Sequence, residues 1–531
     1  MIRPTVANVA DLLREQAGVR GDAGAVSDAR RSLTWSELDA EADRVAAGLV
    51  QLGLVAGYRV AVSLTNRVEF VSCYLGILRA GLVAVPLNPT SPTGEVVRVL
   101  ADSGARVVVC ETDTAAAVRG AVDGLADALA GADEQLRART VVPAVVVVDA
   151  ATVPGEQGFD ALLAAEPVTA VAPQDPHALA VLLYTSGTSG RPRAAMLSHL
   201  ALLTNIEQAA VTTTEAMGPD DVVLGVLPLF HVYGLNGVLG QVLRQGARLL
   251  IEARFDAEQT LALVQREAAT IVPVAPPVLG AWAELSDLAG RLTSVRLVVT
   301  GAGPMTPEDV RRFETAAGVQ VHQGYGLTEA APAVTSTLMS SEPKPGSVGK
   351  ALPGVELRVL DEGHEVEGAD AGEVWVRGGN LFDGYWPDAG EGPDADGWYA
   401  TGDVGYLDAD GDLFLVDRLK EIVIVSGFNV YPSEIEDVLA EVDGVVEAAV
   451  IGVPDAETGE AVVAYVVTEP HQGLDDARVA EQVRAHSDRR LARFKQPRDL
   501  HVVAELPRSV TGKVAKGRLR ATEQRRAMGL A

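Results

Sequence analysis

The apolar and polar residues follow one pattern up to about residue 345. Short apolar runs, such as 58–64 and 178–183, alternate with segments whose apolar residues recur at helical spacing. A first long helix is expected over 34–56, where the capping box Thr34-Trp-Ser-Glu37 opens it. Because the apolar runs are continuous, the strands they predict are covered on both faces, which is typical of mostly parallel sheets packed between helices.

The pattern changes from about residue 345. Short apolar pieces separated by Gly, Pro and turn pairs such as Asp410-Gly411 predict an antiparallel β module over 345–417, expected to form a small barrel. From residue 418 onward, strands and helices mix again and predict a compact α+β unit. We therefore expect an α/β protein with two domains. The large N-terminal domain, 1–417, has stacked mostly parallel sheets plus the small β-barrel, and a small, mobile α+β C-terminal domain spans 418–531.

Length, composition and charge narrow the class of protein. The 531 residues exceed one ordinary hydrophobic core, and 48% hydrophobic with 22% charged residues is typical of a globular protein. A net charge of −28 disfavours nucleic acid and anionic membranes as partners. Two cysteines, Cys73 and Cys110, make no disulfide framework, and the sequence has neither a signal core nor an apolar run long enough to span a membrane. We expect a cytoplasmic protein; a homodimer stays open.

One loop has the composition of an anion-binding site. It reads Tyr184-Thr-Ser-Gly-Thr-Ser-Gly190-Arg-Pro-Arg193 and follows a predicted buried strand. Its glycines let the backbone approach an anion, its hydroxyls donate hydrogen bonds, and Arg193 adds a permanent positive charge. Its spacing is neither that of a Walker A loop nor that of a dinucleotide fingerprint, and on spacing alone a plain turn is the commoner use. We interpret the loop as a triphosphate-holding site because of motifs elsewhere in the chain.

Six stretches in a fixed order carry a resemblance to a known family. They are Tyr184–Arg193, Leu227-Pro-Leu-Phe-His-Val-Tyr-Gly234, Gly324-Tyr-Gly-Leu-Thr-Glu329, Tyr399-Ala-Thr-Gly-Asp403, Asp417-Arg-Leu-Lys-Glu421 and Thr511-Gly-Lys513. Together they are similar to the motifs of the acyl-adenylate-forming superfamily, which includes acyl- and aryl-CoA ligases, peptide-synthetase adenylation domains and luciferases. The resemblance covers nearly the whole chain. The wording around Gly427-Phe-Asn-Val-Tyr-Pro432 is most similar to fatty-acyl-CoA ligases.

The resemblance implies three ligands, ATP, Mg²⁺ and coenzyme A, and assigns residues to the nucleotide. The β- and γ-phosphates would be held by Thr185, Ser186, Gly187, Thr188, Ser189, Gly190 and Arg193. Adenine would lie on Tyr325, beside Gly326, with Gly301, Ala302, Gly303 and Pro304 on its other side. Thr328 would contact the α-phosphate and Glu329 would ligate Mg²⁺, while Asp403 and Arg418 would bind the ribose. Without the resemblance, Thr328-Glu329 fits an ordinary helix start and Asp403 a turn residue.

The resemblance also assigns the catalytic lysine and the acceptor channel. Lys513 would bridge the acid's carboxylate and the α-phosphate, although local sequence alone favours a solvated lysine in a basic tail. Lys420 would be the hinge about which the C-terminal domain turns. Gly427, Phe428 and Asn429 would line the CoA channel. His231, which in an apolar run is usually a core residue, would border the acyl pocket. The family usually has Lys-Gly where this chain has Arg193-Ala-Ala, so we expect a stiffer loop.

The residues expected around the acid are mainly small and apolar. No arginine occurs in Val272-Pro-Val-Ala-Pro-Pro-Val-Leu279 to pair a second carboxylate, which argues against diacids. We expect an ATP-dependent acyl-CoA ligase for a medium- to long-chain fatty acid. The alternatives are an aryl-CoA ligase, an adenylating enzyme that loads a carrier-protein thiol, and a catalytically weak nucleotide-binding protein.

Overall fold

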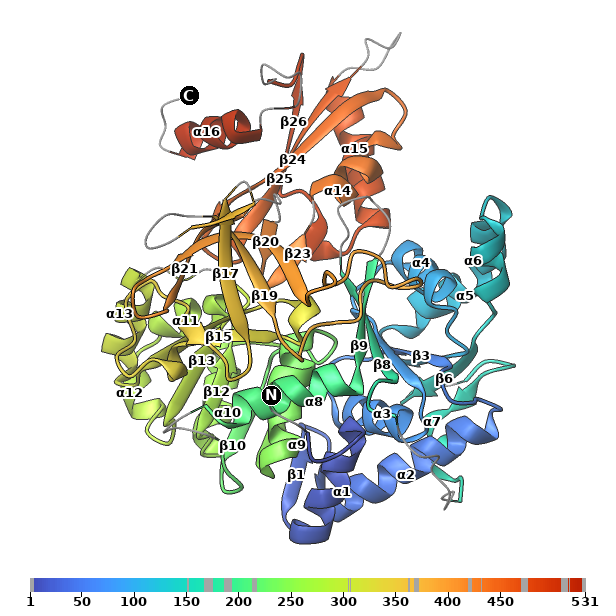
Figure 1. Cartoon of the computed structure of the whole chain (residues 1–531). Helices are drawn as coiled ribbons and strands as arrows, with labels where there is room; N and C mark the ends of the chain where they lie inside the picture. Colours follow the sequence, from blue (N-terminus) through green and yellow to red (C-terminus); the bar gives the residue numbers. More distant parts are fainter. Residues whose placement is uncertain are drawn as a thin grey trace.

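The computed structural model describes most of the chain. The described residues are 4–527 except 150–151, 167–174, 186–192, 213–216, 304, 306, 362, 367–371, 419–422, 431, 469–475, 508–513 and 515. Figure 1 shows the N-terminal two thirds, from blue to yellow, as a broad base of sheets and helices. The C-terminal part, in orange and red, lies on top of this base.

Two mostly parallel sheets form the base. The nine-stranded sheet has the order β16-β15-β14-β13-β12-β10-β11-β1-β2. Its strands are β1 (Gly24–Ser27), β2 (Ser32–Thr34), β10 (Val222–Gly225), β11 (Arg248–Ile251), β12 (Ile271–Val274), β13 (Leu297–Thr300), β14 (Val321–Gly326), β15 (Ala333–Ser336) and β16 (Lys350–Ala351). The central pairs from β1 to β14 are parallel, and both edges end in antiparallel pairs. The predicted mostly parallel sheet is therefore confirmed.

The seven-stranded sheet has the order β7-β6-β5-β3-β4-β8-β9. Its strands are β3 (Arg59–Ser63), β4 (Val83–Pro86), β5 (Val107–Glu111), β6 (Ala144–Val148), β7 (Gln157–Gly158), β8 (Leu179–Thr185) and β9 (Arg193–Ser198). Only the last pair, β8 with β9, is antiparallel. This hairpin spans the expected phosphate loop, so the loop joins two strands at the edge of the sheet.

Helices cover both sheets. They are α1 (Val9–Arg20), α2 (Trp35–Gln51), α3 (Val68–Arg79), α4 (Thr93–Ser103), α5 (Ala115–Ala130), α6 (Glu134–Arg139), α7 (Phe159–Leu163), α8 (His199–Ala210), η1 (Tyr233–Gly240), α9 (Gln241–Gln245), α10 (Ala257–Arg266), α11 (Pro276–Ala283), α12 (Leu288–Arg291) and α13 (Pro307–Ala317). Every residue of α3 is buried, and its side chains belong to an apolar cluster that includes Val60 of one sheet and Val223 of the other. The core thus joins the two sheets.

The expected N-terminal helix is confirmed but ends earlier than predicted. Helix α2 has the capping box, in which Glu37 N donates to Thr34 Oγ1 and Thr34 N donates to the Glu37 carboxylate. It ends at Gln51, because Gly53 adopts a left-handed conformation with φ +82°. None of the described helices is long and apolar enough to cross a membrane.

The antiparallel module lies between the base and the C-terminal unit (Figure 1). Its five strands are β17 (Glu356–Asp361), β18 (His364–Glu365), β19 (Gly372–Arg377), β20 (Trp398–Leu407) and β21 (Leu413–Arg418). Their order is β18-β17-β19-β20-β21, and among the described residues the edge strands β18 and β21 do not pair. The module is therefore an open antiparallel sheet where the sequence suggested a closed barrel.

The C-terminal unit has its own sheet and core. The strands are β22 (Val423–Val425), β23 (Phe428–Val430), β24 (Val445–Asp455), β25 (Gly459–Thr468) and β26 (Asp499–Val503), flanked by helices α14 (Pro432–Ala440), α15 (Asp476–Arg490) and α16 (Lys516–Ala527). Two apolar clusters, one on each face of this sheet, contain only residues of the unit. Residue 420, the expected hinge, lies outside the described residues.

One glycine between the base and the antiparallel module predicts a measurable effect on stability. Gly349 has φ +86°, and a Cβ added there would lie 2.0 Å from the Ser336 carbonyl carbon. Gly411 has a similar φ of +83° with open space around it. We expect Gly411→Ala to lower the free energy of unfolding by about 1–2 kcal/mol through backbone strain. Gly349→Ala should lower it by several times more because of the added clash, as measured by urea denaturation. Equal effects of the two substitutions would show that packing at Gly349 is unimportant.

Candidate functional site

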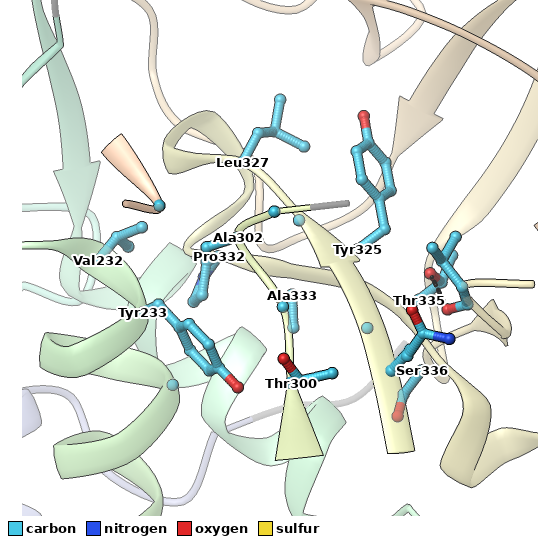
Figure 2. Close-up of a pocket in the computed structure, with 18 of the residues that line it drawn as sticks. Val232, Tyr233, Thr300, Ala302, Tyr325, Leu327, Pro332, Ala333, Thr335 and Ser336 are labelled. Atoms are coloured by element: carbon cyan, nitrogen blue, oxygen red, sulfur yellow. Dashed lines mark hydrogen bonds between the residues drawn. The ribbon is translucent and has the colours of Figure 1, made fainter. Parts of the chain in front are cut away.

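A cavity of about 690 Å³ lies where the nine-stranded sheet, the phosphate-loop hairpin, the antiparallel module and the C-terminal unit meet. Figure 2 shows its interior, with Tyr233 on the side of helix η1 and Tyr325 rising from strand β14. The loop that carries Ala302 lies between them. Thr185, Asp403 and Gly427 line the same cavity. Residues from motifs far apart in the sequence are thus brought to one place.

The two ends of the expected phosphate loop are described. Thr185 ends β8, Arg193 begins β9, and the two are paired in register. The Thr185 hydroxyl donates to the Arg193 carbonyl oxygen at 3.3 Å. The residues between them that the resemblance assigns to phosphate, Ser186, Gly187, Thr188, Ser189 and Gly190, lie outside the described residues. The described ends of this stretch, Thr185 and Arg193, both line the cavity.

The Arg193 side chain is held by two contacts. Its guanidinium carbon lies 3.8 Å from the centre of the Tyr385 ring, and Nη2 is 2.8 Å from Glu391 Oε2. Ala194 and Ala195 are fully buried strand residues that pair with Tyr184 and Leu183 of β8. The expected stiff loop after Arg193 is thus an ordered strand: the two alanines pack in the sheet. Arg193 is the first residue of strand β9, so its side chain starts from a backbone that is fixed in the sheet.

The residues assigned to adenine come from two neighbouring strand ends. Tyr325, at the end of β14, is buried, and Gly301, Ala302 and Gly303 follow β13, the parallel neighbour of β14. A Cβ on Gly301 would lie 3.1 Å from the Gly324 carbonyl oxygen, so a larger residue at 301 would push these two segments apart by a few tenths of an ångström. Gly326 also lines the cavity. Pro304 lies outside the described residues.

The residues assigned to ribose are backbone partners on two neighbouring strands. Asp403 in β20 is paired in register with Arg418 in β21. The Asp403 carboxylate is buried and accepts a hydrogen bond of 2.7 Å from the Tyr325 hydroxyl. The Asp403 amide donates to the Thr401 hydroxyl at 3.1 Å, which fixes the backbone at this position. The tyrosine that would carry the base therefore also orients the carboxylate that would carry the sugar.

Glu329 and Thr328 lie in a single helical turn, η2 (Thr328–Ala330), and both are buried at the cavity wall. The Glu329 carboxylate accepts a hydrogen bond from the Tyr385 hydroxyl. Among the described residues no three His, Cys, Asp or Glu side chains converge to form a complete metal site. A lone buried carboxylate beside a nucleotide site fits Mg²⁺, which takes one or two carboxylates and completes its shell with phosphate oxygens and water.

His231, which the resemblance assigns to the border of the acyl pocket, lines the cavity. Its Nδ1 accepts a hydrogen bond of 3.3 Å from the Tyr233 amide. Desolvation lowers the pKa of His231 to about 4, so the imidazole is neutral at physiological pH. The Phe428 ring of the C-terminal unit lies edge-on to this imidazole at 6.1 Å, in the perpendicular arrangement that aromatic rings favour. A neutral imidazole can position a substrate here without adding charge.

The C-terminal unit reaches the cavity through the β22–β23 hairpin. A Cβ on Gly427, which has φ +82°, would lie 3.8 Å from Ala302, so the hairpin turn sits against the adenine loop. Phe428 stacks between Phe230 of the base, at 5.8 Å, and Phe494, at 4.5 Å. Asn429 pairs through its backbone with Ile424 within the hairpin. The residues expected to form a CoA channel therefore lie at the boundary of the two units.

An ion cluster joins the two units beside this hairpin. Lys495 Nζ lies 3.3 Å from Glu95 of helix α4 and 2.9 Å from Glu434 of helix α14. The Ala492 amide also donates to the Glu95 carboxylate at 3.2 Å. Lys513, the expected catalytic lysine, lies outside the described residues. After it, Leu519 of helix α16 packs on the C-terminal core.

Several residues of this site escape sequence reasoning. Tyr385 contacts both Arg193 and Glu329, Glu391 pairs with Arg193, and Phe494 and Glu95 make contacts between the units. Gly384-Tyr385 resembles an ordinary turn, and Glu391 lies in an acidic, glycine-rich stretch like any solvated loop. No local signal distinguishes them, because their partners are distant in the sequence.

One wall of the cavity, on the side that the resemblance assigns to the acid, follows helices η1 and α9. Tyr233, Gly237, Gln241 and Gln245, spaced four residues apart on η1 and α9, all line it. The facing wall includes Asn205, Ala209 and Thr212. Two amides of this wall are bonded within the protein: Gln241 Nε2 donates to the Ile206 carbonyl at 2.8 Å, and Asn205 Nδ2 to the Ala333 carbonyl at 2.7 Å. The wall therefore combines bonded amides with the apolar surface of Ala209 and the Tyr233 ring.

Comparison with known proteins gives consistent matches along the whole chain. The profile of the AMP-binding enzyme family matches residues 13–386, and that of the AMP-binding enzyme C-terminal domain matches 434–513. The chain is 34% identical over 528 residues to 4-coumarate–CoA ligase 5 of Oryza sativa subsp. japonica, covering 96% of this chain and 94% of that one. It is 31% identical over 526 residues to the long-chain-fatty-acid–CoA ligase of Bacillus subtilis (strain 168), covering 96% and 93%.

Among solved structures, the amide bond synthetase McbA from Marinactinospora thermotolerans superposes with a TM-score of 0.83 at 30% identity. The match covers 97% of this chain and 99% of that protein. The similarity therefore extends over the base, the antiparallel module and the C-terminal unit together.

The bond between Tyr325 and Asp403 predicts the effect of a single substitution on nucleotide binding. Asp403→Asn should weaken ATP binding about 10- to 100-fold, because an amide cannot accept two charge-assisted hydrogen bonds from the ribose. Isothermal calorimetry measures the affinity. The matched control is Asp396→Asn, an exposed residue in the loop before β20. If Asp403→Asn binds ATP as tightly as the wild type, Asp403 does not contact the ribose.

Proposed function

Because the chain belongs to the AMP-binding enzyme family, we propose that its acid–thiol ligase activity serves a medium- to long-chain fatty acid. The chain is an ATP-dependent acyl- or aryl-CoA ligase that uses ATP, Mg²⁺ and CoA, as the CoA ligases of this family do. The ligase first joins the acid to AMP with release of pyrophosphate. The CoA thiol then displaces AMP to give the thioester.

The length of the acyl cavity supports the proposed substrate. The lining residues from Tyr233 to Gln245 extend over twelve helical steps, which corresponds to about 15–18 Å. A single aromatic ring would fill only the first part of this length, whereas an extended alkyl chain fits it. The described lining has two permanent cations, and neither Arg193 nor Arg520 belongs to η1, α9 or α8, the helices that line the part near Gln245. A second carboxylate on the acid would thus have no cation beside it.

An aryl acid is the second candidate because Tyr233 presents an aromatic ring to the cavity (Figure 2). A Cβ on Gly237 would lie 2.8 Å from this ring, so glycine leaves the ring accessible. A planar acid could stack there. The similarity to 4-coumarate–CoA ligase 5 of Oryza sativa subsp. japonica supports an aryl acid such as 4-coumarate as this second candidate.

We assign the chemistry to this chain's own residues as follows. Arg193 and the loop before it bind the β- and γ-phosphates, Tyr325 and Asp403 orient the nucleoside, and His231 positions the carboxylate. Glu329 would hold Mg²⁺, whose charge would offset that of the phosphates. Lys513 supplies a further positive charge between the carboxylate and the α-phosphate. The domain boundary is placed at 417/418, with Lys420 as the hinge, and Gly427, Phe428 and Asn429 border the path of the CoA thiol.

The proposed substrate is tested by initial rates of pyrophosphate release with saturating ATP and CoA. The panel contains hexanoate, decanoate, palmitate, benzoate and 4-coumarate, each also assayed with a carrier-protein thiol in place of CoA. We expect the highest kcat/KM with decanoate or palmitate and CoA. A maximum with 4-coumarate or benzoate would replace the fatty acid by an aryl acid, and activity only with the carrier protein would change the acceptor.

A substitution in the cavity wall tests whether the cavity is long enough for a long acyl chain. Ala209→Phe places a ring across the far part of the acyl side, so kcat/KM for palmitate should fall at least about tenfold, equivalent to about 1.4 kcal/mol in the transition state. Hexanoate is the internal control and should react as with the wild type. An equal loss for both acids would mean that Ala209 does not border the acyl chain.

The role of Lys513 is tested by separating the two half-reactions. Lys513→Ala should lower ATP–pyrophosphate exchange by at least about 100-fold, since the charge it supplies acts in the first transition state. Thioester formation from supplied acyl-AMP should remain close to that of the wild type. Lys516→Ala, three residues later in the basic tail, is the matched control. Loss of both half-reactions, or of neither, contradicts the role assigned to Lys513.

A further inference from the structure

The segment 382–386 connects the two sides of the phosphate end of the cavity. On one side it continues the edge of strand β9: the Asp383 amide donates to the Met196 carbonyl, the Met196 amide to the Gly384 carbonyl, and the Trp386 amide to the Ala194 carbonyl, at 2.9–3.0 Å. The segment is therefore bonded to the strand that begins at Arg193.

On the other side the same segment is bonded to Glu329. The Phe382 amide donates to the Glu329 carbonyl oxygen at 2.9 Å. The Phe382 ring lies edge-on to Tyr385 at 5.0 Å and to Tyr399 at 5.1 Å, which packs this side of the segment tightly. One short stretch of backbone thus fixes the distance between Arg193 and Glu329.

Tyr385 makes the same connection through its side chain. Its ring face lies under the Arg193 guanidinium at 3.8 Å, and its hydroxyl donates to Glu329 Oε1. A carboxylate oxygen only accepts hydrogen bonds, so the Tyr385 hydroxyl is the donor. The Tyr399 hydroxyl, 3.4 Å away, adjoins the same bond.

We propose that Tyr385 is a positioning residue that couples the phosphate-binding cation, Arg193, to the metal-binding carboxylate, Glu329. The hydroxyl fixes the orientation of the carboxylate, and the ring fixes the plane of the guanidinium. This inference rests on the proposed roles of Arg193 and Glu329. Residues that orient a metal ligand in this way commonly change metal affinity by 10- to 100-fold when they are removed.

Glu391 adds a detail to this arrangement. It is largely exposed, with 74% of its side chain accessible, and its ion pair with Arg193 forms at the surface. A solvated pair of this kind contributes little free energy and gives way to a stronger anion. The cation–π contact with Tyr385 needs no anion, so it holds the guanidinium while triphosphate replaces Glu391.

The test compares ATP binding with and without the metal. The dissociation constant of ATP is measured by calorimetry in excess Mg²⁺ and in EDTA, for the wild type, Tyr385→Phe and Tyr385→Leu. Tyr385→Phe keeps the ring, so its affinity in EDTA should equal that of the wild type, while its affinity in Mg²⁺ should fall about tenfold. Tyr385→Leu should bind ATP more weakly in both conditions. Tyr406→Phe, on strand β20 and stacked on Phe414 at 4.9 Å, is the matched control.

Two results would overturn the inference. Tyr385→Phe with unchanged affinity in Mg²⁺ would show that the hydroxyl does not orient the metal ligand. Equal weakening in Mg²⁺ and in EDTA would show that the hydroxyl only supports the local fold, which a lowered Tm would accompany. In both of these results the wild type still binds ATP, so the proposed function stands. A wild type that binds no ATP would overturn the proposed function as well.

Discussion

Repulsion between two anions is the constraint on which the arrangement of this site depends. A carboxylate and a triphosphate must come within bonding distance, and like charges 4 Å apart repel by about 4 kcal/mol near a protein surface. The chain itself is acidic, with a net charge of −28, so its overall electrostatic field does not reduce this repulsion. The described cavity lining contains two permanent cations, Arg193 and Arg520. A further cation is needed where the carboxylate meets the α-phosphate, and the loop that contains Lys513 is the proposed source.

The described contacts between the base and the C-terminal unit include aromatic stacking and an ion cluster. They include the stacking of Phe428 on Phe230 and the ion cluster of Lys495 with Glu95. Burial opposes the charge on Lys495, but its two carboxylate partners outweigh this and raise its pKa, so the cluster holds only while both units are in place. Interfaces built from a few such contacts usually allow domains to rotate. Gly427 lies against Ala302, so the segment that we propose as the border of the CoA path adjoins the cavity.

The sequence predicts elements whose signal is local. The run 58–64 corresponds to β3 (Arg59–Ser63) because a strand buried on both faces must be apolar throughout, and Thr34 and Glu37 mark a helix start through their own hydrogen bonds. Contacts between distant segments leave no such signal. Tyr385 and Glu329 are 56 residues apart, and nothing near either one predicts their bond. Thr185, Glu329 and Asp403 could be grouped beforehand only through resemblance, and the cavity they share is a property of the whole fold.

This chain has Arg193-Ala-Ala where the family usually has Lys-Gly. The three-dimensional surroundings of these residues explain the difference, and the local sequence does not. Read locally, Arg193-Ala-Ala indicates a loop that has lost its glycine. In the structure the alanines are strand residues, and a Cβ suits a buried strand better than glycine does. A guanidinium is planar and can lie on a tyrosine ring while its nitrogens remain directed at an anion, whereas an ammonium offers no plane to stack. Arginine at 193, alanine at 194 and 195, and tyrosine at 385 therefore form one consistent set: a rigid strand presents a pre-oriented cation beside the carboxylate that would hold the metal.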